Sequence, residues 1–178
     1  MSQDELNKLI DECGRNDRSA QETVYKYFYK EMYVICNRYA EHRHDAQSIL
    51  NDGFLKAFKN IARFNNTLGQ FDSWLKTIMI NTAIDHTRSI KRKSTTISID
   101  HAPEPGNDDF ELNYIVQKQD ILRHLNLLPA VTKMVINLSA FEGYAYKDIA
   151  ALLGISESTA RWHVGEARKK LKQSLQIK

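Results

Sequence analysis

The 178-residue sequence predicts an all-α protein with two small helical domains joined by an acidic linker. Apolar residues recur every three or four positions along most of the chain, which is the spacing of amphipathic helices. Gly is rare, with seven residues, and long strand-like alternation is absent. The stretch 94–114 breaks the helical pattern, because it has five acidic residues, no Lys or Arg and two of the three prolines. We therefore predict domains at 1–93 and 115–178, with 94–114 as the linker.

Four helices are expected in the first domain. The first lies near residues 6–13. The second has an apolar stripe formed by Val24, Phe28, Met32 (or Tyr33), Ile35 and Tyr39. The third is expected to begin at Asp45, and its stripe consists of Ile49 or Leu50, Phe54, Ala57 (or Phe58) and Ile61. None of these helices is long enough to be stable alone, so they must pack together.

The fourth helix begins at Phe71 and ends in a basic cluster, residues 88–93. One side is apolar and should face the core: Leu75, Ile78, Met79, Thr82 and Ala83. The neighbouring quarter of the helical wheel is mostly polar and carries Trp74, Thr77, Asn81, Asp85 and Arg88. This helix combines a packing side with polar groups that can meet an acidic partner.

The second domain is expected to begin with an amphipathic helix over 115–128, ended by Pro129, and a second helix over 130–141. Two shorter helices follow with the spacing of a helix-turn-helix. Gly154 lies where a helix end requires a positive φ angle, which costs glycine little. Ser156 is a suitable N-cap for the last helix, because its hydroxyl can accept from exposed amides.

The last helix divides into a packing side and a small or basic side. The packing side consists of Ala160, Val164, Ala167 and Leu171, and the other side of Ser158, Arg161, Trp162, Gly165, Arg168, Lys169 and Lys172. A helix with such an outer side can enter a DNA major groove and meet phosphates. The alternative is a solvated surface helix whose basic end suits the macrodipole. Trp162 favours DNA, since an outward Trp is costly unless it covers a partner or folds back on the core.

Composition excludes several function classes. The net charge is only +3, but it is distributed as two mildly basic halves around the acidic linker. No apolar run is long enough to span a bilayer, and the N-terminus lacks an export signal. Two cysteines do not form a disulfide framework, so we expect a reducing cytoplasm. Cys36, His42 and His44 invite a metal interpretation, but a core thiol and surface imidazoles are the simpler one. No enzyme motif is recognisable, and we expect no catalytic residue, metal or cofactor.

Longer motifs resemble a known family, the extracytoplasmic-function sigma factors of bacterial RNA polymerase. The stretch FDSWLKTIMINTAIDHTR resembles the family's FxxWLxxIxxNxxxDxxR helix, and DAQSILNDGFLKAF resembles DAEDxxQExFLxxF. The C-terminal half resembles LxxLPxxxKxVxxLxxxEGYxYxDIAxxLGIS followed by STxRxxxxxARKKL. The resemblance implies a sigma-two-like domain and a sigma-four-like domain. It also implies a factor that binds core RNA polymerase and directs it to promoters, without being an enzyme.

The resemblance implies roles for particular residues. The helix from Asp45 to Phe58 would contact the polymerase clamp of the largest subunits, through Asp45, Gln47, Ser48, Asn51, Asp52 and Lys56. Here Asn51 and Asp52 replace the usual Gln-Glu and are each one methylene shorter. Asp45 also has a simpler interpretation as a helix N-cap.

The minus-ten promoter element would be recognised and melted by Asn65, Asn66, Trp74, Asn81, Asp85, Arg88, Lys91 and Arg92. The loop at 65–71 is where the family captures an extruded base, on which Trp74 could stack. Simpler alternatives remain: Trp74 as a core residue, Asn81 in a helix–helix hydrogen bond, and the basic cluster as a solvated start of the linker.

The minus-thirty-five element would be read as duplex by Ser156, Ser158, Thr159, Arg161, Trp162, Arg168 and Lys169. Glu166 stands where the family often has a basic residue, and it is expected to point away or pair with Arg168 or Lys170. The linker would thread towards the active-centre cleft of the polymerase. An anti-sigma factor is the other expected partner, and direct membrane insertion is not expected.

Two other functions fit parts of the sequence. A helix-turn-helix repressor or activator would bind operators without polymerase, and the second half alone permits this. A polymerase-binding inhibitor would lack productive promoter recognition. The helices at 45–58 and 71–88 argue for a sigma factor.

Overall fold

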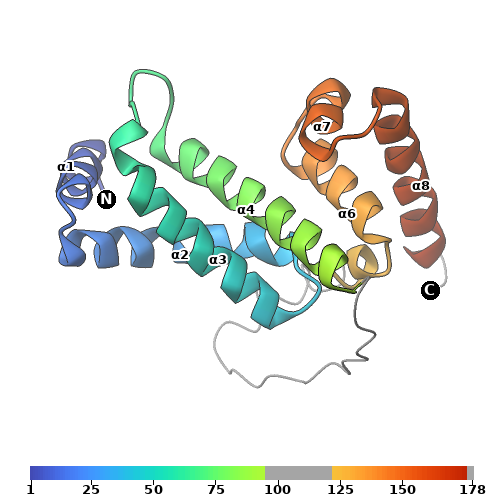
Figure 1. Cartoon of the computed structure of the whole chain (residues 1–178). Helices are drawn as coiled ribbons and strands as arrows, with labels where there is room; N and C mark the ends of the chain where they lie inside the picture. The colour runs from blue at the N-terminus through green and yellow to red at the C-terminus, as the bar shows by residue number, and fades with distance from the viewer. Residues whose placement is uncertain (95–121, 176–178) are drawn as a thin grey trace. The chain divides into compact units, whose positions relative to one another are not determined.

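The computed structural model describes residues 1–94 and 122–175, with side chains for 1–89 and 122–174. These ranges contain helices and turns but no strand, so the all-α prediction is confirmed. Backbone contacts divide the chain into two compact units, Met1–Lys93 and Ser94–Lys178 (Figure 1). Apart from Ser94, the predicted linker at 94–114 lies outside the described residues.

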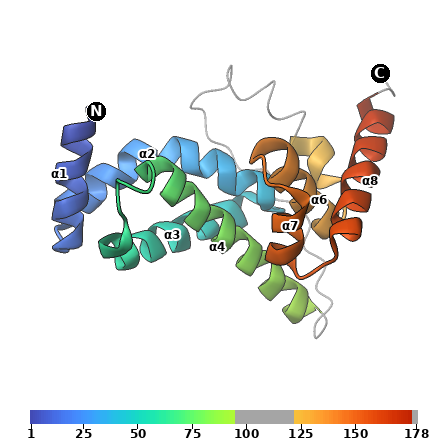
Figure 2. The ribbon, with the colours of Figure 1, turned by 90° about the horizontal axis from the view of Figure 1, so that it is seen from above.

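The N-terminal unit is built from four α-helices and one short 3₁₀ turn. They are α1 (Gln3–Gly14), α2 (Arg18–Tyr39), α3 (Arg43–Asn60), η1 (Ile61–Arg63) and α4 (Phe71–Ser94). Ser2 and Glu5 form a capping box at the start of α1, and Asp17 caps α2 by accepting from the amide of Ala20 at 2.9 Å. Figure 2 shows α2, α3 and α4 lying against one another, with α1 at one end of α2.

The third helix begins earlier than predicted. It starts at Arg43, and His42 at the N-cap position makes no side-chain capping bond. Asp45 therefore lies inside the first turn and is not the N-cap. Its carboxylate is still favourably placed there, because the positive end of the helix dipole attracts negative charge.

The predicted apolar stripes form the core of this unit. The buried residues include the expected side chains of α2 and α3, listed here as Val24, Phe28, Met32, Ile35, Tyr39, Ile49, Leu50, Phe54, Ala57 and Ile61. In α4, Leu75, Met79, Thr82 and Ala83 are buried as predicted, whereas Ile78 is only half-buried. Ile80 and Ile84 are buried as well. The helix therefore buries a wider sector than its sequence pattern indicated.

A close contact between α3 and α4 occurs at Gly53. A Cβ atom added to this residue would overlap Sδ of Met79 and lie 3.0 Å from its Cε. Met79 is fully buried, so its side chain has little room to move. The glycine therefore permits the two helices to approach at this point.

The C-terminal unit contains a short helix at 122–126 and then a helical series. The later elements are α6 (Ala130–Ile136), the π-helical turn η2 (Asn137–Phe141), α7 (Tyr146–Leu153) and α8 (Glu157–Leu175). Gly154 ends α7 with φ of +67°, as predicted. The amide of Thr159 donates to Oγ of Ser156 at 3.1 Å, which confirms Ser156 as the cap of α8. α7 and α8 form the predicted helix-turn-helix.

Packing of α8 on α6 involves both apolar and polar groups. Ala160, Val164 and Ala167 are buried, as the sequence predicted. Beside them, Oγ1 of Thr132 lies 2.9 Å from Nδ1 of His163. Burial lowers the pKa of His163 from its ordinary value, since the charged imidazolium loses hydration. The folded unit therefore favours the neutral ring.

We predict that Gly53→Ala lowers the free energy of unfolding by about 1–2 kcal/mol, because overpacking outweighs the helix propensity gained from alanine. Gly14→Ala is the matched control, since a Cβ at Gly14 meets no atom within 4 Å. Urea unfolding of the three proteins measures the difference. Equal stability of Gly53→Ala and the wild type would show that Met79 adjusts without cost.

We predict a pH-dependent loss of stability from His163. A folded pKa below the unfolded one means that the unfolded state binds the proton first. The stabilisation is complete above about pH 6.5, the pKa of an unfolded histidine. It is lost progressively as the pH falls below that value and through the lower folded pKa. The difference in urea midpoint between wild type and His163→Gln should be smaller at about pH 5 than at about pH 8. If both proteins lose the same stability between these pH values, the loss comes from the titration of other groups.

Candidate functional site

The outward side of α3 carries polar side chains that are tied to α2. Oη of Tyr25 donates to Oδ1 of Asn51 at 3.1 Å, and Oη of Tyr29 donates to Oε1 of Gln47 at 3.2 Å. Nε2 of Gln47 also donates to Oδ1 of Asn51, at 3.4 Å. Two of the six predicted polymerase-binding residues are therefore ordered by contacts within the unit.

Leu55 lies on the same side of α3 and was not singled out from the sequence. Its side chain is 53% exposed although it is a large aliphatic residue. Its spacing from Ser48 is seven residues, or about two helical turns, and this places both residues on one face, with Asp52 between them. Heptad spacing from the predicted polar residues was the signal that could have identified it. The face thus combines polar groups with an exposed apolar one.

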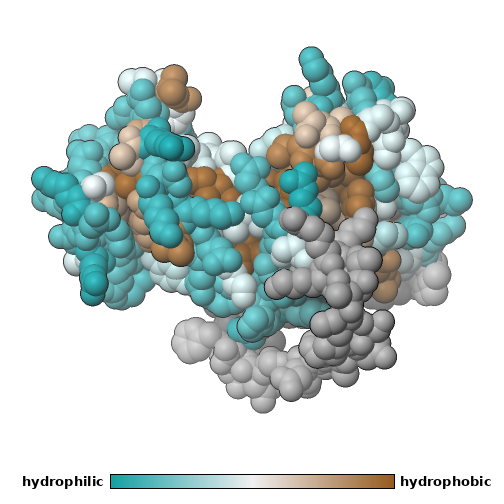
Figure 3. Space-filling model, in the orientation of Figure 1, coloured by the Kyte–Doolittle hydropathy of each residue, from teal (hydrophilic) through white to brown (hydrophobic). Residues whose placement is uncertain are grey.

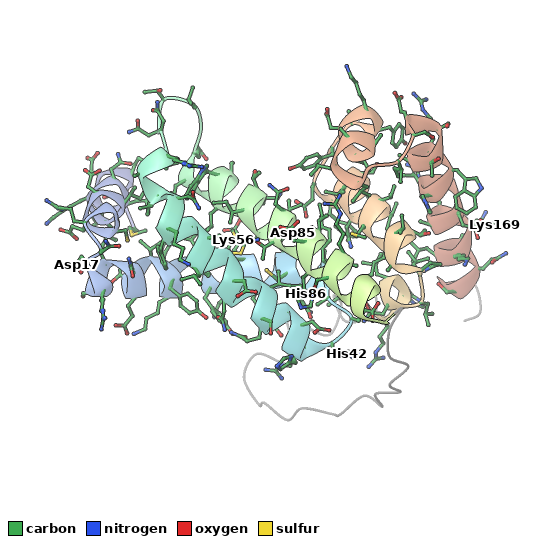
Figure 4. All side chains as sticks on the ribbon, viewed as in Figure 1. Asp17, His42, Lys56, Asp85, His86 and Lys169 are labelled. Carbon is green, nitrogen blue, oxygen red and sulfur yellow. The ribbon has the colours of Figure 1, made fainter. Side chains whose placement is uncertain are left out.

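Asp45 and Lys56 instead point to α4. Nζ of Lys56 lies 3.3 Å from Oδ2 of Asp85, and Nε2 of His86 lies 3.9 Å from Oδ1 of Asp45. Figure 4 shows Lys56 and Asp85 on these neighbouring helices. Asp85 also lies 4.0 Å from Nη1 of Arg88. These contacts join one predicted polymerase-binding residue, Lys56, to two predicted minus-ten residues.

A pocket of about 350 Å³ opens beside this ion pair. Its lining residues come from the end of α3, from η1 and from α4: Lys56, Asn60, Arg63, Trp74, Ile78, Asn81 and Thr82. Thr82 is 3% exposed, and its hydroxyl has no hydrogen-bond partner among the described residues. A buried hydroxyl without a partner is costly, so a ligand that reached it would relieve that cost. The pocket offers cationic and amide groups beside an indole ring.

Trp74 packs partly in the core and also lines the first pocket. Its ring is half-buried, and its centroid lies 5.5 Å from the rings of Phe64 and Phe71. The same residue lines the pocket beside Asn81, which is exposed and makes no hydrogen bond to another described residue. Trp74 therefore anchors α4 to the core and also forms a wall of the pocket.

Two of the predicted minus-ten residues line a second pocket, of about 310 Å³, and not the first one. Asn65 and Asn66 line it together with residues of α1, of η1 and of the position after η1, namely Asn7, Ile10, Asp11, Gly14, Ile61, Ala62 and Phe64. Oδ1 of Asn65 also accepts from the amide and hydroxyl of Thr67, at 3.0 and 2.8 Å, which fixes the turn of the loop. The two asparagines and Trp74 thus face different cavities. Beyond them in the loop, Leu68 is 86% exposed. Figure 3 shows hydrophobic residues at the surface among mostly hydrophilic ones.

Polar side chains at the start of α8 contact one another. Besides capping the helix, Oγ of Ser156 lies 2.8 Å from Oγ of Ser158 and 2.7 Å from Oγ1 of Thr159. Arg161 pairs with Glu157 and lies 5.3 Å from the ring centroid of Tyr146. These predicted minus-thirty-five residues are therefore held in place within the helix-turn-helix.

Farther along α8, the outer side is exposed and basic. Trp162 is 61% exposed, and its ring meets the edge of His163 with a centroid separation of 4.9 Å. Arg168 and Lys169 are exposed on the same helix (Figure 4). Glu166 lies 3.7 Å from Nζ of Lys170, one of the two pairings expected from the sequence. The negative charge is thereby partly compensated.

Other sequence predictions concern single residues. Cys36 is fully buried, and burial raises the pKa of its thiol to about 12, so it packs as a neutral group. Among the described side chains, no three His, Cys, Asp or Glu residues gather where they could hold a metal ion. Lys91 and Arg92 belong to α4, but their side chains lie outside the described ones.

No helix in 1–94 or 122–175 combines the length and apolar character needed to cross a membrane.

Comparison with protein families assigns both units. Residues 24–93 match the family model "Sigma-70 region 2", and residues 118–171 match "Sigma-70, region 4". Together these matches cover most of the chain, in the order expected from the motifs.

Individual relatives support this assignment. The RNA polymerase sigma-H factor of Pseudomonas aeruginosa is 26% identical over 193 residues, which cover 99% of this chain and 96% of the relative. The RNA polymerase sigma factor SigZ of Bacillus subtilis is 30% identical over 142 residues, which cover 78% of this chain and 79% of the relative. Other matching relatives are named ECF RNA polymerase sigma factors, where ECF denotes the extracytoplasmic-function group.

A solved structure has the same fold. The sigma factor RpoE from Bartonella quintana, in complex with the anti-sigma factor NepR, matches with a TM-score of 0.58 and 22% identity. The match covers 88% of this chain and 96% of that one. The sequence motifs, the two helical units and these matches agree: the chain belongs to the extracytoplasmic-function group of the sigma-70 family, the initiation factors that direct RNA polymerase to promoters.

Proposed function

We propose that the N-terminal unit, residues 1–93, binds core RNA polymerase through the outward face of α3 and captures a minus-ten base in the pocket beside α4. The main support for this proposal is that α3 has two different surfaces. One face has exposed Leu55 among polar groups, and the other supplies Lys56 to a pocket with an unpaired buried hydroxyl.

On the polymerase-facing side, Leu55 would be the apolar centre and Gln47, Ser48, Asn51 and Asp52 its polar surround. Interface energy is concentrated in a few apolar or aromatic anchors that are buried on binding, while the polar rim provides register. The partner would be the clamp of the largest subunits. Asp45 lies near His86 and would help to hold α3 against α4.

In the pocket, Trp74 would stack on an extruded base while Asn81 and Thr82 reach its edge. Stacking on an aromatic ring contributes about 1–3 kcal/mol per base and partly offsets the cost of extrusion. Lys56 and Arg63 place positive charge at the pocket, where the phosphates of the strand would lie. Arg88, Lys91 and Arg92 would extend this electrostatic contact along α4, with Asp85 held between Lys56 and Arg88. Asn65 and Asn66 would shape the adjoining loop.

We propose that the C-terminal domain predicted at residues 115–178 reads the minus-thirty-five duplex through α8. Arg168 and Lys169 would neutralise phosphates, and Trp162 would cover a sugar or base edge at the groove. Ser156, Ser158, Thr159 and Arg161 would hold the start of the helix and contact the backbone there. The acidic segment at 94–114 would enter polymerase sites that otherwise hold nucleic acid.

We also propose an anti-sigma factor as a partner and the cytoplasm as the location. RpoE, which shares this fold, was solved with such an inhibitor. A free operator-binding repressor would use the C-terminal unit alone, and its affinity for DNA would not depend on polymerase.

The test is a reconstitution. Purified protein is added to sigma-free bacterial core polymerase with fragmented DNA of its own genome, and the initiated transcripts are mapped. We expect new start sites that share two upstream elements. Binding to core without transcripts would favour an inhibitor, and tight binding to free DNA without binding to core would favour a repressor.

We predict that Leu55→Asp weakens binding to core polymerase at least about tenfold, because a charge replaces the apolar centre of the interface. The urea midpoint should change little, since the side chain is 53% exposed. Leu68→Asp is the matched control, because Leu68 is exposed in the same unit but lies in the loop, and it should retain core binding. Titration of labelled protein with core polymerase measures both. Unchanged affinity of Leu55→Asp would place the polymerase contact elsewhere.

We predict that Thr82→Val raises the stability of the free protein slightly and slows promoter opening by about tenfold. Valine removes an unpaired buried hydroxyl, which is costly in the free protein, and the same change removes a hydrogen bond to the captured base. Thr23→Val, at an exposed position of α2, is the control for a Thr-to-Val change within a helix. Permanganate footprinting of the melted minus-ten region follows opening. Normal opening by Thr82→Val would remove the hydroxyl from base capture.

A further inference from the structure

Three tyrosines follow one another along α2 on the side that meets α3. Tyr25, Tyr29 and Tyr33 are spaced by four residues, and all three are half-buried. The ring centroid of Tyr25 lies 4.6 Å from that of buried Phe54, and the rings of Tyr29 and Tyr33 are stacked with an interplanar angle of 6°. Packing therefore fixes where the hydroxyls of Tyr25 and Tyr29 can reach.

Those two hydroxyls set the direction of a hydrogen-bond network. Tyr25 and Tyr29 donate to Oδ1 of Asn51 and Oε1 of Gln47, and Gln47 then donates its Nε2 to Asn51. Oδ1 of Asn51 thus accepts two hydrogen bonds, which matches its two lone pairs. Burial raises the pKa of Tyr25, so its hydroxyl keeps the proton that it donates.

The network leaves one group of Asn51 unused. Asn51 is exposed, and its Nδ2 makes no hydrogen bond to any described residue. In this arrangement the amide oxygen is turned inward, toward its two donors. The side chain therefore presents an NH₂ group, a donor of two hydrogens, at the outward face of α3.

We propose that Nδ2 of Asn51 donates to an acceptor oxygen on core polymerase, and that Tyr25 and Tyr29 are positioning residues that hold Asn51 in this orientation. This inference rests on the proposed function of the α3 face. It specifies the partner surface: a carbonyl or carboxylate oxygen opposite Asn51, a cation or other donor opposite Asp52, and an apolar group opposite Leu55.

Asn51→Asp distinguishes the hydrogen bonds that Asn51 accepts within the protein from the one that it is proposed to donate to polymerase. A carboxylate still accepts from Tyr25 and Gln47, so the urea midpoint should stay close to that of the wild type. Outward, it offers an acceptor in place of a donor, so core affinity should fall about tenfold. Tyr25→Phe changes no charge and frees the amide to turn, and it should weaken core binding about threefold.

A double-mutant cycle tests whether Tyr25 acts through Asn51. In an Asn51→Ala background, Tyr25→Phe should cause no further loss of core affinity. Tyr27→Phe is the matched control, because Tyr27 is 53% exposed on the same helix and its hydroxyl makes no hydrogen bond to a described residue. The measurement is fluorescence anisotropy of the full chain, labelled at its amino terminus and titrated with core polymerase.

The outcomes distinguish this inference from the proposed function. Wild-type affinity of Asn51→Asp would overturn the donor assignment, and an undiminished effect of Tyr25→Phe in the Asn51→Ala background would overturn the positioning role. Either result together with weak binding by Leu55→Asp leaves the α3 face as the polymerase surface. Normal binding by Leu55→Asp would instead remove the proposed function on which the inference rests.

Discussion

The close approach of α3 and α4 depends on the missing side chain of Gly53. Met79, which is fully buried, occupies the space that a Cβ would take. The two helices also share polar contacts. Lys56 reaches Asp85, and Asp45 approaches His86. The pocket beside Lys56 is lined by residues of both helices.

One consequence is that α3 faces two environments. Its outward side bears Asn51, Asp52 and Leu55, which we assign to the polymerase. Lys56 follows directly on Leu55 but lines the pocket that we assign to DNA. Since a packed helix is stiff, docking of one side fixes where the pocket stands relative to the polymerase. Under these two proposals, polymerase binding and base capture would be coupled through the geometry of α3.

Many polar residues of the candidate surfaces are already engaged within the protein. Ser156 caps α8, Asn65 holds a turn, and Arg161 pairs with Glu157. These bonds reduce the conformational entropy that would be lost on binding, because the side chains are ordered beforehand. The Tyr25–Asn51–Gln47 network has the same effect on α3, and it also selects which end of an amide faces outward. Pre-organisation of this kind favours specific partners over merely charged ones.

The helices and the family were determined by the sequence itself. Helix formation depends on signals that lie within one or two turns of each other, so they can be recognised along the chain. Examples are the periodic apolar residues, Gly154 at a helix end and Ser156 at a helix start. The start of α3 was misplaced by two residues, because Asp45 has the chemistry of a cap but lies in the first turn. The wider burial of α4, at Ile80 and Ile84, also escaped the pattern of a single helix.

The division of the candidate site was decided only by tertiary packing. Lys56 and Asp85 are 29 residues apart, and nothing in their local sequence indicates that they meet. The local sequence also does not indicate that Tyr25 and Asn51 meet. Nor does it indicate that Asn65 and Asn66 line one pocket while Trp74 lines another. Local periodicity shows which side of a helix is polar. Which partner each polar group meets depends on the distance and rotation between helices, and these are set by how the whole core packs.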